Sequence, residues 1–341
     1  MDHAENAIAK GSATEQQLRK VINDALMRIG ERKLNDPTVR ELLDSWIQDK
    51  RGSAKERTIR TYEQARNQFL AFLGPRANRS IRLLKKNDVV EFRDQLLAEG
   101  RTATTVNNIV KLCLPGPFET ARKDGLLDFN PFASVARLKA ATIERDTFSP
   151  SMVAALLEAA RGTDWAGAVL VGYTTGARLQ DAANLRWTSV DTENGVLCFT
   201  AQKTGKRSLI GLHDDLHNWI VNQSVPDDPD SFVFPTLANR PSGGPKGLCV
   251  EFSNLMRKAK LEPKVLRTKA PGQRGRTVRS LGFHSFRHGA ATAVFNNAAL
   301  QDIARRVTSH AGKGSLQRYI HDDVVAIRAA TNLIPRLPKA S

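Results

Sequence analysis

The second half of the sequence contains six polar residues whose types could carry out phosphodiester chemistry. Arginine has a planar guanidinium group that donates two parallel hydrogen bonds to a phosphate. A tyrosine hydroxyl can attack phosphorus, and lysine and histidine can transfer the protons that the reaction moves. Such a set could bind and cleave a phosphodiester without a metal ion. In chain order the residues are Arg178, Lys203, His284, Arg287, His310 and Tyr319.

The two arginines lie at positions where helices are expected to begin. Arg178 follows Thr174-Thr175-Gly176, and Asp181 lies one helical turn later, where its carboxylate could support the guanidinium. Arg287 lies three residues after His284, so both side chains are expected on one helix face. Two arginines that face one phosphate could stabilise the negative charge of a pentacoordinate transition state. Either arginine alone is typical of a solvated surface, so the prediction depends on the ordered set.

The lysine is expected near the tip of a β-hairpin. Residues 196–200 and 208–210 have strand composition, and Lys203-Thr-Gly-Lys206 between them is typical of a turn. A lysine at this tip could reach into a DNA groove and protonate a leaving oxygen. Lys206 could take the same part as Lys203, and both could instead contact phosphates.

Tyr319 is the candidate nucleophile, nine positions after His310. A phenol has an ordinary pKa of about 10 and attacks poorly unless nearby cations favour the phenolate. The arginines and the lysine would supply those cations. His284 and His310 could bind the phosphate or exchange a proton with the nucleophile or the leaving group.

The overall composition favours a nucleic acid partner. The 341 residues include 51 Lys and Arg against 35 Asp and Glu, which gives a formal net charge of +16. Proteins this basic usually bind a polyanion. No apolar run approaches the ~20 residues of a membrane span, and the N-terminus lacks a secretory pattern. The three cysteines have no metal-ligand spacing. We therefore expect a cytoplasmic protein, associated with the nucleoid if it is prokaryotic, that requires no metal or other cofactor.

The chain is expected to be mainly α-helical with a small antiparallel β-sheet. Apolar residues at helical spacing predict a helical arm in residues 1–35 and a compact helical domain in residues 36–140. Residues 141–149 are expected to be a linker. A second domain of mixed α/β structure follows in residues 150–341, and Ser149-Pro150 is typical of the start of its first helix.

A basic segment rich in Gly and Pro, residues 264–279, is expected to be an exposed loop. Loops of this composition can place positive side chains against the phosphates of a duplex. The candidate DNA contacts outside the six polar residues are Lys206, Arg207, Arg274, Arg276 and Arg279.

In order and spacing the six polar residues resemble the tyrosine recombinases, also called the phage integrase family. The resemblance covers most of the chain. It implies that residues 36–140 form a core-binding, SAM-like domain that contacts DNA, and that residues 150–341 form the catalytic domain with a C-terminal helix. It also implies the roles of the site. Arg178 and Arg287 would clamp the scissile phosphate, and Asp181 would support the first arginine. Lys203 would be the general acid, His284 and His310 would complete the pocket, and Tyr319 would form a 3′-phosphotyrosyl link.

The resemblance further implies a site-specific recombinase that acts on double-stranded DNA without ATP. It would work as a homotetramer on two DNA sites, with a dimer on each. The C-terminal helix, about residues 324–333, would dock on a neighbouring subunit, although packing in its own chain explains its apolar face equally well. Two alternatives share the pattern: a type IB topoisomerase that relaxes DNA, and a DNA-binding protein of the same fold that has lost activity.

The chain departs from the family pattern at two places. Thr308-Ser309 replaces the usual Leu-Gly before His310. Leu114-Pro-Gly-Pro117 falls where the family has a continuous helix, and proline in a helix interior costs about 3 kcal/mol or more. We therefore expect the helical domain to be kinked or destabilised at this point.

Overall fold

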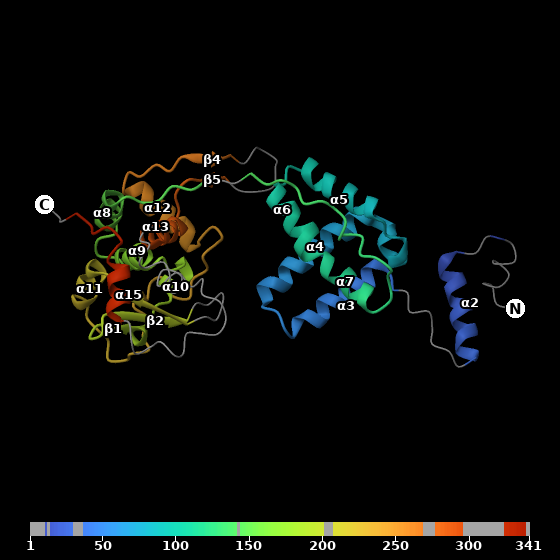
Figure 1. Cartoon of the computed structure of the whole chain (residues 1–341), viewed down its shortest axis with the longest axis horizontal. Helices are drawn as coiled ribbons and strands as arrows, with labels where there is room; N and C mark the ends of the chain where they lie inside the picture. The colour runs from blue at the N-terminus through green and yellow to red at the C-terminus, as the bar shows by residue number, and fades with distance from the viewer. Residues whose placement is uncertain are drawn as a thin grey trace. The chain divides into compact units, whose positions relative to one another are not determined.

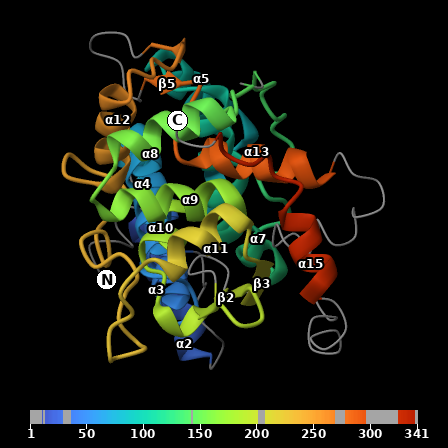
Figure 2. The same cartoon turned by 90° about the vertical axis from the view of Figure 1, so that its left-hand side faces the viewer.

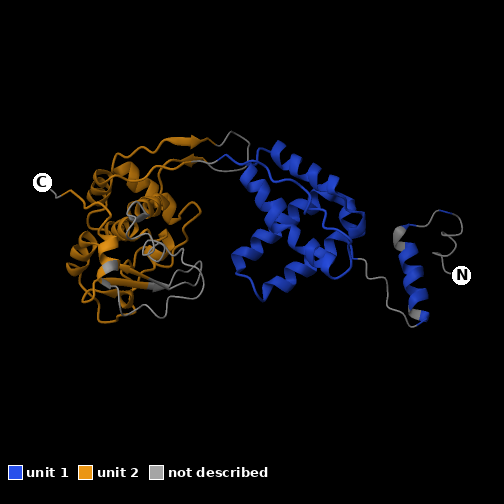
Figure 3. Ribbon diagram, viewed as in Figure 1, with its two compact units in different colours: residues 1–142, 269–276 blue, residues 143–268, 277–341 orange. Residues whose placement is uncertain are grey.

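A computed structural model of the chain describes residues 11, 14–29, 37–141, 144–200, 207–268, 277–295 and 324–338. The chain divides into two compact units, with a boundary between residues 142 and 143 (Figure 3). Each unit has its own hydrophobic core. The described residues are mainly helical with two small antiparallel sheets, which confirms the predicted fold class. Within these residues, no helix combines the length and apolar character needed to cross a bilayer.

The first unit is built from helices around a cluster of phenylalanines. Phe69 packs against Phe92, Phe118 and Phe132, with ring centroids 5.0, 6.4 and 5.4 Å away. The predicted capping box between Thr38 and Glu41 is present at the start of α3. The elements, most of them labelled in Figure 1, are α2 Glu15–Arg28, α3 Val39–Arg51, α4 Glu56–Leu73, η1 Gly74–Asn78, η2 Ile81–Leu83, α5 Lys86–Ala98, α6 Ala103–Asn107, the π-helical η3 Asn108–Cys113 and α7 Pro115–Lys123.

Pro115 and Pro117 lie at the start of a helix. The helical path is interrupted after η3, as predicted, and α7 begins at Pro115. Pro115 and Pro117 lie in the first turn, where backbone N–H groups have no acceptor within the helix, so no helical hydrogen bond is lost. Asn130 fastens this start, because its amide donates to the Pro115 carbonyl at 3.1 Å and its oxygen accepts the Phe132 N–H at 3.0 Å. The structure therefore gives no reason to expect destabilisation from the prolines.

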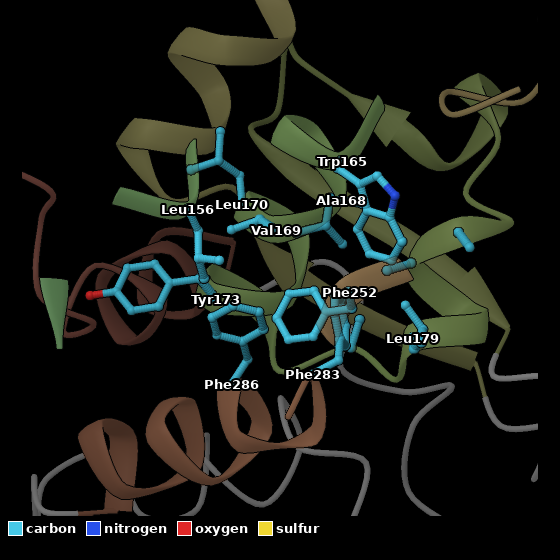
Figure 4. Packing of buried hydrophobic residues seen from close by; sticks show 14 of the residues in the cluster. Leu156, Trp165, Ala168, Val169, Leu170, Tyr173, Leu179, Phe252, Phe283 and Phe286 are labelled. Atoms are coloured by element: carbon cyan, nitrogen blue, oxygen red, sulfur yellow. The ribbon is translucent and has the colours of Figure 1, made fainter. Parts of the chain in front are cut away.

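In the second unit the central element is α9, Asp164–Thr175. It contacts α8, α10, α11 and α13 (Figure 2), and almost all its residues from Trp165 onward are buried. Phe283 and Phe286 anchor the start of α13 beside Tyr173 and Phe252 (Figure 4). The remaining elements are α8 Pro150–Ala159, α10 Leu179–Ala183, η4 Trp187–Ser189, β1 Val190–Asp191, β2 Val196–Thr200, β3 Arg207–Gly211, α11 Asp214–Val221, α12 Leu248–Lys258, β4 Val265–Arg267, β5 Val278–Arg279, α13 His284–Phe295 and α15 Val324–Thr331.

The strands form two antiparallel sheets. Strands β1, β2 and β3 follow one another in a three-stranded sheet, and the pairing of Cys198 with Leu209 confirms the predicted hairpin. The prediction that residues 264–279 are only a loop is wrong at both ends, because β4 pairs with β5. All three residues of β4 are exposed, so the segment lacks the alternating pattern that would have revealed a strand.

The C-terminal helix α15 and the segment after it pack within their own chain. Helix α15 contacts β3, and Gly211 has no side chain where the Arg328 backbone passes; a Cβ there would lie 2.6 Å from the Arg328 Cα. The His213 Nδ1 accepts the Asp215 N–H at 3.1 Å, so Nε2 carries the proton and donates to the Ile334 carbonyl at 3.0 Å. The structure therefore shows this helix packed in cis, and its docking on a neighbouring subunit stays a prediction.

The core around α9 predicts the effect of one added methyl group. A Cβ at Gly167 would lie 2.3 Å from the Trp219 ring and 2.4 Å from the Phe234 ring. We expect Gly167→Ala to lower the free energy of unfolding by about 1–3 kcal/mol, because the surrounding side chains must leave their packed positions. Urea unfolding followed by tryptophan fluorescence measures this. Gly243→Ala is the matched control, since nothing lies within 4 Å of its added Cβ. Equal stability of the two variants would contradict the packing described for α9.

Candidate active site

The site is organised by the turn that joins α9 to α10. Gly176 caps the end of α9; it has a left-handed conformation with φ of +63°, and its N–H donates to the Gly172 carbonyl at 3.0 Å. A Cβ at Gly176 would lie 3.3 Å from the Ala290 Cβ and 3.4 Å from the Arg287 Cα. Glycine therefore serves two purposes here: it permits the reversal of the chain, and it lets α13 approach closely.

Arg178 lies two residues beyond this glycine, immediately before α10. Its backbone is extended, and its side chain makes no capping hydrogen bond to α10. The Asp181 carboxylate is 4% exposed and lies 3.8 Å from the Arg178 Nη1. This ion pair lies on one side of the guanidinium.

Arg287 reaches the same turn from α13. Its Nη1 donates to the Gly176 carbonyl at 3.1 Å, across 111 residues of sequence. Phe283 and Phe286, which flank His284, are both buried and fix the first turn of α13. They thereby fix the position of Arg287 relative to the turn at Gly176. Burial lowers the pKa of Arg287, the charge of Arg178 lowers it further, and Asp181 raises it. The structure therefore brings both predicted arginines together, with one buried carboxylate beside them.

His284 is the third predicted residue in this cluster. It begins α13, and its ring stands edge-on to the His288 ring with centroids 5.1 Å apart. The imidazole reaches solvent, yet enough protein surrounds it that desolvation lowers its pKa. The positive charges of His288, Arg287, Arg145 and Arg178 lower that pKa further, in this order of effect. A neutral imidazole at neutral pH can accept a proton, which is the state a general base requires.

The sequence did not identify Arg145 as part of this cluster. It lies in the predicted linker, where no helical or strand periodicity relates it to distant residues. Its charge acts on His284 together with the charges of the two arginines of the site. Only the folded chain brings the charges of these three arginines to His284.

The structure does not describe most of the other predicted site residues. Lys203, Lys206, Arg274, Arg276, His310 and Tyr319 lie outside the described residues. Arg207 is the first residue of β3, and Arg279 is exposed in β5.

The two described tyrosines serve packing roles. Tyr62 packs edge-on against Trp46 in the first unit, with centroids 5.0 Å apart. The Tyr173 hydroxyl donates to the Pro335 carbonyl at 2.7 Å. Burial, and to a lesser extent the charge of Asp215, raises the pKa of Tyr173 to about 12. A phenol that is buried, bonded and harder to ionise is a poor nucleophile.

Known proteins share this sequence pattern and fold. The family model described as the phage integrase family matches residues 147–325. A probable integrase/recombinase of Methanocaldococcus jannaschii is 23% identical over 322 residues, covering 90% of this chain and 94% of the relative.

Two solved structures are similar in fold. A lambda integrase tetramer bound to a Holliday junction is 16% identical, with a TM-score of 0.60 over 86% of this chain and 83% of that one. The Tn1549 transposon integrase in complex with a circular intermediate DNA is 18% identical, with a TM-score of 0.60 over 88% and 96% of the two chains. The matched region holds Arg178, Asp181, His284 and Arg287, the residues gathered around the Gly176 turn. The chain therefore belongs to the phage integrase family, the tyrosine recombinases.

Proposed function

We propose that this protein is a site-specific recombinase that cleaves and rejoins duplex DNA through a 3′-phosphotyrosyl intermediate. The observation that carries the proposal is the pairing of Arg178 and Arg287 around the Gly176 turn. Two guanidinium groups from distant parts of the chain converge there, with the buried carboxylate of Asp181 beside them. Cations held so close together repel each other, and a phosphate between them would relieve that repulsion.

In the proposed cleavage step, one bond to phosphorus forms, another breaks, and two protons are transferred. The Tyr319 oxygen attacks the phosphorus and loses its proton to a base, for which the neutral His284 imidazole is suited. The bond between phosphorus and the 5′ oxygen breaks, and Lys203 donates a proton to that oxygen. Rejoining is the reverse: a 5′ hydroxyl attacks the phosphotyrosine and the phenol leaves. The arginines hold the non-bridging oxygens throughout and stabilise the charge that develops on them.

Lys203 is proposed over Lys206 as the general acid only on the family resemblance, and His310 is proposed to complete the pocket on the same ground. Exchange of either lysine for methionine on a substrate with a 5′-thiolate leaving group separates them. A thiolate leaves without a proton, so it restores cleavage only for the variant that has lost the general acid.

The proposed partner is double-stranded DNA. The protein would bind it as a homotetramer on two DNA sites, with a dimer on each site. Two observations support it. The formal net charge of +16 suits a polyanion, and the lambda integrase of similar fold was solved as a tetramer on a Holliday junction. Arg279, exposed in β5, is a proposed phosphate contact, as are Arg207, Arg274 and Arg276.

The nucleophile assignment predicts which tyrosine becomes attached to DNA. We expect the wild type to form a covalent complex with nicked suicide duplexes built from inverted repeats in the DNA that flanks the gene. Tyr319→Phe should form none, because no other hydroxyl can replace the phenol. Denaturing gels with end-labelled DNA measure the complex. Tyr62→Phe is a matched control that should retain it, since Tyr62 packs in the first unit.

A complex that survives Tyr319→Phe would overturn the assignment. No complex with the wild type on any flanking duplex would favour the DNA-binding protein without activity. If the wild type relaxes supercoiled DNA and never joins two duplexes, the protein is instead a topoisomerase of the same chemistry.

The charge around His284 predicts a change in its pKa when DNA binds. In the free protein we expect that pKa below the ordinary value of about 6.5, because desolvation and neighbouring cations disfavour the charged imidazole. A DNA phosphate would neutralise those cations, so the pKa should rise on binding and the complex should take up protons near that pH. NMR titration of the His284 ring measures both values, with His217, in α11, as the internal reference. An unchanged or lower pKa in the complex would contradict the proposed site.

A further inference from the structure

Hydrogen bonds and packing against α13 hold the segment through which the chain enters the second unit. The Asp146 N–H donates to the Ser280 carbonyl at 3.1 Å, and the Ser280 N–H donates to the Lys264 carbonyl at 2.8 Å. These two bonds extend the β4–β5 ribbon by one more chain segment. Residues 144–148, called the entry segment below, are therefore held at the base of that ribbon.

Side-chain packing fixes the other edge of the entry segment. The Phe148 ring lies 4.4 Å from the Phe286 ring, centroid to centroid. A Cβ at Gly289 would lie 3.7 Å from the Thr147 Cβ, which is ordinary contact. Phe286 and Gly289 lie on either side of Arg287 in α13. The entry segment is therefore attached to the turns that carry His284 and Arg287.

Arg145 is the positive side chain of the entry segment. It is half-buried, and within the described residues its guanidinium has no hydrogen bond or ion pair. Its neighbours Glu144 and Asp146 are exposed, and neither pairs with it in this part of the chain. This is unlike Arg161 in the same unit, which forms an ion pair with Glu158. The positive charge of Arg145 therefore lies beside the site without a protein counter-ion among the residues described.

The uncompensated charge indicates what the position binds. The charges of Arg145, Arg178 and Arg287 all act on His284, while the buried carboxylate of Asp181 is close to Arg178. One phosphate is suited to the fork formed by Arg178 and Arg287 around Gly176. A third guanidinium on a separate segment is better placed to meet another phosphate, because the negative charges of a DNA strand recur at every nucleotide.

We infer that Arg145 binds a DNA backbone phosphate next to the one that Arg178 and Arg287 hold. The inference rests on the proposed function, and it adds a DNA contact in the segment that connects the two units. Binding of the duplex would then engage the connecting segment directly, in addition to the two units.

The salt dependence of binding tests this contact. Fluorescence anisotropy with a labelled random-sequence duplex, measured between low and moderate salt, gives the slope of log K against log salt concentration. We expect Arg145→Ala to reduce the magnitude of that slope by about one, the value for one lost phosphate contact. Arg145→Lys should keep most of it, because the charge remains. Arg161→Ala should match the wild type, since that arginine is exposed and paired with Glu158.

A second readout separates a phosphate contact from a merely structural role. Arg145→Gln should raise the pKa of His284 in the free protein, because one of the charges that lower it is gone. NMR titration measures this without DNA. If Arg145→Ala keeps the wild-type slope, or Arg145→Gln leaves the His284 pKa unchanged, the inference is wrong. If the wild type forms the covalent complex through Tyr319, such a result would overturn only the assignment of Arg145. If the wild type forms no covalent complex, the proposed function itself would be overturned.

Discussion

The arrangement of the site depends on the hydrogen bond from Arg287 to the Gly176 carbonyl. This bond joins α13 to the end of α9 across 111 residues of sequence. It requires a left-handed residue without a side chain at position 176, because a Cβ there would meet Ala290 and the Arg287 backbone. Arg178 follows two residues later, so one turn positions both arginines.

The second feature of the site is the close approach of several positive charges. Burial and neighbouring positive charges lower the pKa values of Arg287 and His284 in the free protein, and the carboxylate of Asp181 offsets part of this effect at Arg287. A folded protein that keeps several cations together stores unfavourable energy that an anionic ligand releases. The same charges explain why His284 can be neutral and act as a base near arginines that stay charged.

The features that the sequence predicted correctly have local signals. Thr38 with Glu41, and Ser149 with Pro150, mark helix starts by capping chemistry that neighbouring residues determine. The β2–β3 hairpin has strand composition on both sides of a turn. Arg145 has no such signal, because its place beside His284 depends on the bond from Asp146 to Ser280 and on the packing of Phe148. The β4–β5 pair was missed because its first strand has no buried face.

The central claim is that Arg178 and Arg287 act by neutralising charge on the phosphate. Replacing a non-bridging oxygen of the scissile phosphate with a methyl group tests it, since a methylphosphonate carries no negative charge. On an ordinary duplex we expect Arg178→Ala and Arg287→Ala to slow cleavage by roughly 10²- to 10³-fold. On a methylphosphonate duplex their cleavage rates should approach that of the wild type. Variants that remain equally slow on both substrates would contradict the claim, because the arginines would then be needed for something other than the charge.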